Sequence, residues 1–449
     1  MRAILSYHLT VLALCLTVIT ASLTPARATT LIRDADIEYA LQKLAAPILA
    51  AAGLPRSTRV LIISDRTLNA FVLDRGHIFI HSGLLLRMKT PAMLQSVIAH
   101  EAAHIANGHM TRRHANMARA NTISGLGMAL AVAAAAAGAN PQAAGAASLG
   151  IAGSAQRVFF AHTRAEESAA DAAGIGYMAR AGADPKAFEE VLNIFRGQEV
   201  LAETRQDPYA RTHPLSRDRL RAVQSRAATA KPGKPDPQAA YWYARATGKL
   251  SAYLNAPSWT FTRTGRKLAN DDITLMRQAV AFHRASDTRN ARAAAAKLVQ
   301  LRPGDPFVHD LHGQILLETR DAPAAARAYK RAASLAPDNA LVLAGYGRAL
   351  LAAGNPRAAL PVLEKSRARD FRNAAVLRDL GTAYAKSGQN GMASLVTAER
   401  YALRGDMKTA HTHATRALGL LPRGAPSWRR AEDVQIAAQA ALKNLKRRK

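Results

Sequence analysis

The stretch His100-Glu101-Ala102-Ala103-His104 decides how most of this chain is interpreted. On a helix, residues four apart lie on one face, so the two histidines point in the same direction. Neutral imidazoles are good zinc ligands. Glu101 lies roughly 100° further round the helix, where it can reach a metal-bound water and take its proton. The pattern therefore predicts a metal-dependent hydrolase whose site is built on a helix.

The residues around this stretch predict a buried helix. Thr90 is a suitable N-cap, Pro91 suits the first helical position, and Gly108 is a suitable stop after Asn107. Apolar side chains accompany the histidines at Leu94, Val97, Ile98 and Ile105. A helix that carries a buried metal needs such a setting, whereas a surface helix with a chance match would be more polar.

The segment before this helix predicts a small sheet. Residues 34–52 have the pattern of an amphipathic helix, and three short apolar runs predict strands at residues 59–63, 69–73 and 77–80. The last strand directly precedes the metal helix. We expect strand 77–81 to present an edge to which an unfolded substrate adds as a further strand.

A catalytic zinc site needs a third protein ligand and an open position. Downstream candidates are Glu166, Glu167, Asp171 and a few histidines. Glu167 and Asp171 are four residues apart on a predicted helix. One of them can therefore bind the metal while the other braces a ligand histidine.

Taken together, these segments resemble the zinc metallopeptidase family of the CAAX prenyl endopeptidases and HtpX. The matching pieces are Asn69-Ala-Phe71, Ser82-Gly-Leu-Leu85, the H-E-x-x-H stretch and Arg164-Ala-Glu-Glu-Ser-Ala-Ala-Asp171. The resemblance covers residues 30 to about 225. It implies a zincin-like metallopeptidase domain made of helices and a small β-sheet.

The resemblance also implies roles for individual residues. It makes His100, His104 and Glu167 the ligands of one Zn²⁺ per chain, and Glu101 the general base. It makes Asp171 the carboxylate that orients a ligand. Glu166 is the alternative ligand, although the Glu-x-x-x-Asp spacing favours Glu167.

A further segment, Thr212-His-Pro-Leu-Ser216 followed by Arg219, is also similar to this family. His213 has three possible roles: a fourth, blocking metal ligand, a stabiliser of the oxyanion, or a capping and packing histidine. A blocking His213 would make the resting enzyme latent, because no water could then be activated at the open position. His109 and His114 are expected on the helix surface or behind a ligand, and not as ligands.

Length, composition and charge limit the protein class. The chain has 449 residues, of which 49% are hydrophobic, which predicts two or three domains with real cores and excludes a disordered protein. The net charge of +29 attracts polyanions in general. It is spread along the chain, so most of it is expected to solubilise the surface, and nucleic acid is not an expected partner.

Residues 1–28 have the features of a signal peptide, with an apolar core at 11–19 and a small-x-small site at Ala26-Arg27-Ala28. The single cysteine, Cys15, lies inside this segment, so the exported chain would have none. That usage is in keeping with a bacterial periplasm. Residues 120–156 carry no charge and are rich in Ala and Gly, which predicts a helical hairpin beside the site. Peripheral membrane contact through this run is the alternative.

The C-terminal half repeats with a period of 34 residues. Gly313, Gly347 and Gly381 are in phase with one another, as are Ala291, Ala325 and Ala359. This period is typical of tetratricopeptide repeats, whose helix pairs bury their apolar faces by stacking. The turn at Gly405 is one and a half periods after the previous similar turn, so we expect the phase to break there.

The predicted organisation is therefore mainly α. It comprises a signal peptide (1–28), a metallopeptidase domain (29–225), a linker with a connecting helix (226–256) and an all-α repeat solenoid (257–449). With the signal and the repeats, the chain resembles the soluble periplasmic branch of the family. The segment Tyr241-Trp-Tyr-Ala-Arg-Ala246 also resembles that branch.

This branch implies an endopeptidase for misfolded or misassembled envelope and outer-membrane proteins, with the repeats contacting the outer-membrane assembly machinery. The alternative is a repeat-based chaperone or scaffold for that assembly, with a mostly latent protease.

Overall fold

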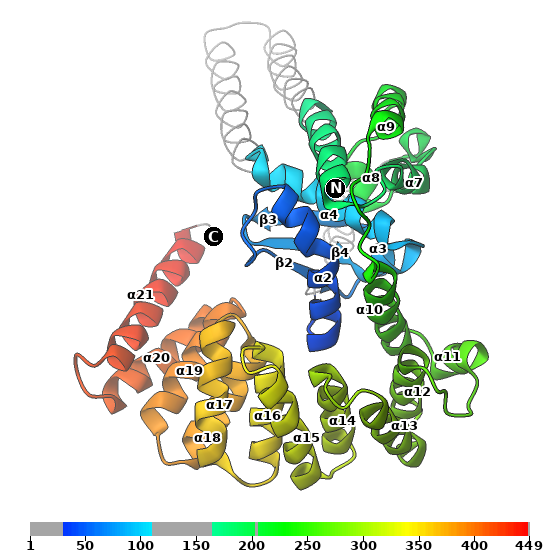
Figure 1. The fold of residues 1–449 in the computed structure, drawn as a ribbon. Helices are drawn as coiled ribbons and strands as arrows, with labels where there is room; N and C mark the ends of the chain where they lie inside the picture. Colours follow the sequence, from blue (N-terminus) through cyan, green and yellow to red (C-terminus); the bar gives the residue numbers. More distant parts are fainter. Residues whose placement is uncertain (1–29, 110–163, 203–204, 448–449) are drawn as a thin grey trace, which may run out of the picture.

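The computed structural model describes residues 30–109, 164–202 and 205–447. Its helices surround one small sheet at the top of the molecule and form a curved array of paired helices below it (Figure 1). The upper part contains, in chain order, β1 (Leu31–Ile32), α2 (Ala35–Ala51), β2 (Arg59–Ile63), β3 (Ala70–Asp74), β4 (His77–His81), α3 (Ser82–Arg87) and α4 (Pro91–Ala106). The helix over residues 164–181, α7 (Ala187–Ile194), η1 (Gln198–Val200), α8 (Pro208–Thr212) and α9 (Arg217–Thr229) follow.

The strand order in the sheet is β1-β2-β4-β3. β2 and β4 are parallel, and β1 and β3 flank them in antiparallel pairs. The prediction that strand 77–81 presents an edge is therefore wrong, because both sides of β4 are paired. Among the described residues, β1 and β3 are the outer strands of this sheet.

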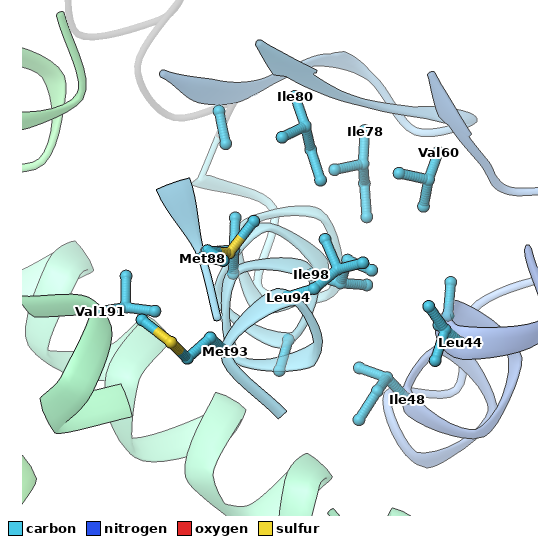
Figure 2. Close-up of a cluster of buried hydrophobic side chains, with 14 of the residues drawn as sticks. Leu44, Ile48, Val60, Ile78, Ile80, Met88, Met93, Leu94, Ile98 and Val191 are labelled. Carbon is cyan, nitrogen blue, oxygen red and sulfur yellow. The ribbon is translucent and has the colours of Figure 1, made fainter. Parts of the chain in front are cut away.

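The core of the upper part lies between the sheet and helices α2 and α4 (Figure 2). Val60, Ile78 and Ile80 point from the sheet towards Leu94 and Ile98 of α4, and all five side chains are at most 2% exposed. The sheet alternation puts these residues on one face, and the helix presents its own apolar face to them. The predicted apolar setting of the H-E-x-x-H helix is thereby confirmed.

Helix α10 (Ala239–Leu254) joins the upper part to the repeats. It packs on α2 and α12, and its Ala246 and Leu250 belong to the same core as the sheet. Two buried cations on α10 pair with acids at the start of α2. Arg245 Nε lies 2.6 Å from Asp36 Oδ1, and Lys249 Nζ lies 3.0 Å from Asp34 Oδ1. The connecting helix is therefore held along its length by apolar and ionic contacts.

The repeat region begins with α11 (Pro257–Thr264), and the helices after it come in pairs that follow the 34-residue period. They are α12 (Asp272–Arg284), α13 (Thr288–Leu301), α14 (Pro306–Glu318), α15 (Ala322–Leu335), α16 (Ala340–Ala352), α17 (Pro356–Arg369), α18 (Ala374–Lys386), α19 (Asn390–Leu403), α20 (Met407–Leu420) and α21 (Pro426–Arg447). Successive pairs start at Asp272, Pro306, Ala340 and Ala374, and the glycines sit where helices touch. A Cβ on Gly347 would lie 2.4 Å from Leu363.

The helix pairs continue past Gly405, where we expected the phase to break. α20 begins at Met407, 33 residues after the start of α18, whereas the earlier pairs start 34 residues apart. The turn at Gly405 connects two repeats, whereas the similar turn at Gly354 lies within one. The final helix, α21, has 22 residues where the others in the array have at most 14.

The predicted signal peptide at 1–28 and the small-residue run at 120–156 lie outside the described residues. Among the residues that the structure describes, no helix combines the length and the apolar character that crossing a membrane requires.

Candidate metal centre

Helix α4 fixes the first part of the site. The Thr90 hydroxyl accepts a hydrogen bond from the Met93 N–H, and Pro91 occupies the first turn, as predicted. Asn107 is the C-cap, and Gly108 takes a positive φ of 67°, which stops the helix. His100 and His104 consequently share one face of a rigid helix, with their Nε2 atoms 3.1 Å apart.

The helix over residues 164–181 supplies the acids. It approaches α4 closely at Gly174, where a Cβ would lie 3.3 Å from the backbone of Ala99 and 2.6 Å from the ring of Phe188. One to two turns before this contact, the same helix presents Asp171 and Glu167, both at most 1% exposed. Glu166 is also buried but is not among the clustered ligand side chains.

Four side chains converge on one point. One potential ligand atom from each of His100, His104, Glu167 and His213 lies within 4.8 Å of the others. His100 Nε2 lies 3.2 Å from Glu167 Oε2, and His104 Nε2 lies 3.4 Å from Glu167 Oε1. His213 Nδ1 lies 3.2 Å from His100 Nε2 and 2.9 Å from Glu167 Oε2.

This donor set fits a tetrahedral metal ion. Zinc bonds of about 2.0 Å place the corners of a tetrahedron about 3.3 Å apart, close to the contacts of 2.9 to 3.4 Å between these side chains. Three imidazoles and one carboxylate are also a donor set that zinc accepts. The residues present therefore suit a metal ion held wholly by protein ligands.

The electrostatics of the cluster favour positive charge at its centre. Burial opposes the charged form of His100, but its hydrogen bonds with Asp171 and Glu167 prevail and raise its pKa to about 9. Burial likewise acts to raise the pKa of Glu167, yet the neighbouring His213 and His100 hold that pKa well below its ordinary value. A cation bound here would satisfy the same carboxylate.

Glu101 stands beside the cluster and is fully buried. Its Oε1 lies 3.5 Å from Nε2 of His213. It is not one of the four clustered ligands. The carboxylate therefore faces the metal position from the side that His213 occupies. A group that accepts a proton from an attacking water has to lie in such a position.

Each ligand histidine of α4 is oriented by a partner behind it. His100 Nδ1 lies 2.9 Å from Asp171 Oδ1, so the Nε2 atom faces the cluster. His104 Nδ1 lies 2.8 Å from Nδ1 of His109, which is 1% exposed. Such contacts fix the tautomer and the direction of a ligand imidazole.

His213 enters the site from the turn between α8 and α9. Its ring packs against Tyr209 with centroids 4.5 Å apart, and Tyr209 stacks in turn on Phe195 at 4.8 Å. Arg219 Nη1 donates to the carbonyl oxygens of His213 and Pro214, each at 3.1 Å. The position of His213 is therefore fixed through both its ring and its backbone.

Arg219 also reaches the acids. Its Nε and Nη2 atoms donate to the two oxygens of Asp171, at 2.6 and 3.0 Å, and its Nη1 lies 3.3 Å from Glu167. His109 lies behind the ligand His104, one of the two places expected for it, whereas no role was predicted from the sequence for Arg219 or Tyr209. The available signal was that Arg219 stands six residues after His213, within the family-like segment. His114 lies outside the described residues.

Two family models match the chain. Peptidase family M48 matches residues 32–227, and a tetratricopeptide repeat model matches residues 316–378. A Vibrio cholerae protein is 35% identical over 188 residues, which are 41% of this chain and 38% of that protein. The beta-barrel assembly-enhancing protease of Escherichia coli (strain K12) is 26% identical over 309 residues, which are 68% of this chain and 62% of that protein. The matched segments span less than two thirds of either relative.

The repeats have weak structural neighbours. The crystal structure of MamA protein is 16% identical and has a TM-score of 0.31, with the match covering 38% of this chain and 88% of that one. The repeats are therefore assigned from their 34-residue period and from the family model, and not from this similarity.

Proposed function

We infer that this chain is a zinc-dependent endopeptidase, because its residues 32–227 belong to peptidase family M48 and tetratricopeptide repeats follow them. This membership agrees with the resemblance that the motifs predicted. The single observation that carries the proposal is the buried convergence of His100, His104, Glu167 and His213 within 4.8 Å, with Glu101 beside them.

In the proposed mechanism, His100, His104 and Glu167 hold one zinc ion. When bound, zinc polarises a peptide carbonyl and acidifies water. Glu101 receives the proton of the attacking water and passes it to the leaving amine, since its carboxylate lies beside the cluster, 3.5 Å from Nε2 of His213. Asp171 keeps Nε2 of His100 directed inward, and Arg219 holds Asp171 in place.

We further propose that the substrates are misfolded or misassembled outer-membrane proteins in the bacterial periplasm. The name of the Escherichia coli relative, a beta-barrel assembly-enhancing protease, supports this substrate class. The predicted signal peptide at residues 1–28 supports export. The repeats are the proposed contact with the assembly machinery.

Replacement of Glu101 by Gln tests the peptidase proposal. The amide keeps the size of the side chain but cannot accept a proton, so cleavage of unfolded casein should fall by at least about a hundredfold. The zinc content, measured on the same sample, should equal that of the wild type. Unchanged cleavage in this variant would show that the proteolytic assignment is wrong.

A second candidate function is a scaffold or chaperone for outer-membrane assembly with a mostly latent protease. The observation that favours it is the position of His213, whose Nδ1 completes the ligand set at 2.9 and 3.2 Å from its neighbours. The two candidate functions predict different phenotypes for cells whose only copy of the protein carries Glu101→Gln. A scaffold would keep the outer membrane intact in such cells, whereas loss of barrier function would identify cleavage as the essential activity.

A further inference from the structure

Helix α21, the last helix that the structure describes, has one packed face and one open face (Figure 1). Ala431 and Ala438 are fully buried and lie seven residues apart, so they mark the face that packs on α19 and α20. Arg429, Ile436 and Lys443 follow the same spacing of seven residues on the side away from those two helices, and all three are exposed. We call this second side the open face of α21.

Aliphatic side chains are exposed on and near the open face. Ile436 is 59% exposed, and Leu420, at the turn that leads into α21, is 51% exposed. Ala440, one turn after Ile436, is exposed as well. The described array has no later helix to cover this face, and uncovered faces in repeat arrays are usually polar. Packing within the described chain therefore does not account for an isoleucine at this position.

The same end of the array is strongly basic. Residues 404–449 contain 11 Lys and Arg against 3 Asp and Glu. Among the described residues of this segment, Arg430 is the only cation that pairs with a carboxylate, Glu399 at 2.7 Å. Asp433 lies on the open face and offsets part of its positive charge. The remaining positive charge is available to an anionic partner.

Unpaired cations combined with exposed aliphatic side chains suit the surface of an anionic lipid bilayer. The cations attract the head groups, and the aliphatic side chains enter the boundary between head groups and acyl chains. Single-stranded nucleic acid instead needs exposed aromatic rings on which its bases stack. The aromatic residue of α21, Trp428, is only partly exposed, and its Nε1 donates to the carbonyl oxygen of Leu418 at 3.2 Å. The side chains present therefore favour lipid.

We propose that the open face of α21 lies on the surface of an anionic phospholipid bilayer. Ile436 enters the head-group boundary, while Arg429 and Lys443 lie against lipid phosphates. The helix rests on the bilayer and does not cross it, because charged side chains occur along its length. This surface shares no residue with the metal cluster, so the proposal goes beyond the peptidase function and does not rest on it.

Binding of the exported protein to vesicles tests the contribution of charge. The vesicles contain phosphatidylcholine alone, or equal parts of phosphatidylcholine and phosphatidylglycerol, and bound protein is measured by co-flotation. The wild type should bind only the vesicles with phosphatidylglycerol, and added salt should release it. Arg429→Gln/Lys443→Gln should bind them at least about tenfold more weakly, because each cation near the surface adds to the attraction.

Arg327→Gln/Lys330→Gln is the matched control, since it removes the same charge from exposed positions on α15. This variant should bind as the wild type does. Equal loss in the two double variants would mean that only the total charge matters, and would overturn the proposal. Equal binding of the wild type to both kinds of vesicle would also overturn it.

A dye at position 436 tests whether the aliphatic side chain reaches the lipid. Ile436→Cys gives the exported chain a single cysteine, because Cys15 lies in the predicted signal peptide. A polarity-sensitive dye on this cysteine should emit at shorter wavelength when phosphatidylglycerol vesicles are added. The same dye on Leu301→Cys should not respond, although Leu301 is 41% exposed at the end of α13. No shift at position 436, or an equal shift at both positions, would contradict the proposed contact.

Soluble polyanions distinguish lipid from other acidic partners. Ile436→Asp should weaken vesicle binding about tenfold, because a charged side chain does not enter the head-group boundary. Tighter binding of the wild type to polyglutamate or to a thymidine oligonucleotide than to the vesicles would identify a different partner and overturn the proposal. Binding is measured without cleavage, so a failure here is distinguishable from a failure of the peptidase assignment.

Discussion

Arg219 links the acids of the candidate metal centre to the turn that carries His213. Its guanidinium makes paired hydrogen bonds with Asp171 and also donates to the backbone of the turn that carries His213. The planar fork of an arginine suits this double task, which a lysine could not perform. The orientation of His100 and the closed position of His213 are therefore physically coupled.

His213→Ala should raise the rate of casein cleavage several-fold. Removal of the ring opens the position that His213 Nδ1 occupies next to His100 and Glu167, while the three remaining ligands still hold zinc. Initial rates and zinc content are measured on wild type and variant. A fall in rate with zinc retained would instead support a role for His213 in stabilising the oxyanion.

Asp171→Asn should weaken zinc binding by about ten- to a hundredfold, because the neutral amide orients and polarises His100 less well. Competition with a chelator of known affinity gives the value. Asp218→Asn is the control, since Asp218 is 93% exposed on the neighbouring helix. Equal affinity of both variants would remove Asp171 from the proposed role.

The sequence predicted the helical part of the site because its residues are close together in the chain. His100 and His104 are one helical turn apart, as are Glu167 and Asp171. The contact of Arg219 with Asp171 joins residues 48 positions apart. No local spacing encodes such a contact, which depends on how α9 packs against the helix over residues 164–181.

Gly174 allows the helix over residues 164–181 to lie close to α4. A side chain there would meet Phe188 at 2.6 Å and Ala99 at 3.3 Å, so Gly174→Ala should push the helix over residues 164–181 away from α4. We expect a loss of about 1–3 kcal/mol in the free energy of unfolding and weaker zinc binding. Urea denaturation and chelator competition measure the two effects.

Gly176→Ala is the control on the same helix. Its Cβ would only approach Arg180 at 3.4 Å, so the better helix propensity of alanine should stabilise the protein by about 0.5–1 kcal/mol. Destabilisation of similar size in both variants would mean that the close approach at Gly174 has no special part in assembling the site.

Individual elements were predicted more securely than their pairing. The strand and helix boundaries near Thr90 and Arg59–Ile63 match the sequence signals, because caps and alternation are local. The parallel pairing of β2 with β4 skips the strand between them in the chain, and the sequence carries no local mark of it. The turn at Gly405 was misassigned because turns within and between repeats use the same residue types.

At the scale of the whole molecule, buried ions connect the peptidase part to the repeats. Arg245 pairs with Asp36 of α2 and with Asp305 at the start of α14. Arg33, next to the sheet, pairs with Asp370 in the turn between α17 and α18 at 2.6 Å. These pairs fix the arrangement in which the repeat array lies against α2 (Figure 1).

Asp310, on α14 beside this network, should make stability depend on pH. Burial raises its pKa from 3.8 to about 7, although Lys249 acts to lower it. The folded state therefore holds the proton more tightly than the unfolded state. The contribution of Asp310 to stability falls as pH rises from about 4 to 7 and is constant above that.

The free energy of unfolding of Asp310→Asn, compared with that of the wild type, should consequently be more favourable at pH 8 than at pH 5. Urea midpoints at the two pH values measure this difference. Asp433→Asn, at an exposed position on α21, should show no such difference. A gain in stability for Asp310→Asn that is the same at both pH values would contradict the raised pKa of Asp310.

The proposed peptidase activity depends on a zinc ion in the buried cluster. The most direct test measures zinc per chain by mass spectrometry after purification in the presence of zinc and removal of loosely bound ions. We expect one zinc per chain in the wild type and almost none in the double variant His100→Ala/His104→Ala, which leaves only Glu167 and His213 of the cluster. A wild type without zinc, or one zinc retained in the double variant, would contradict a zinc site here.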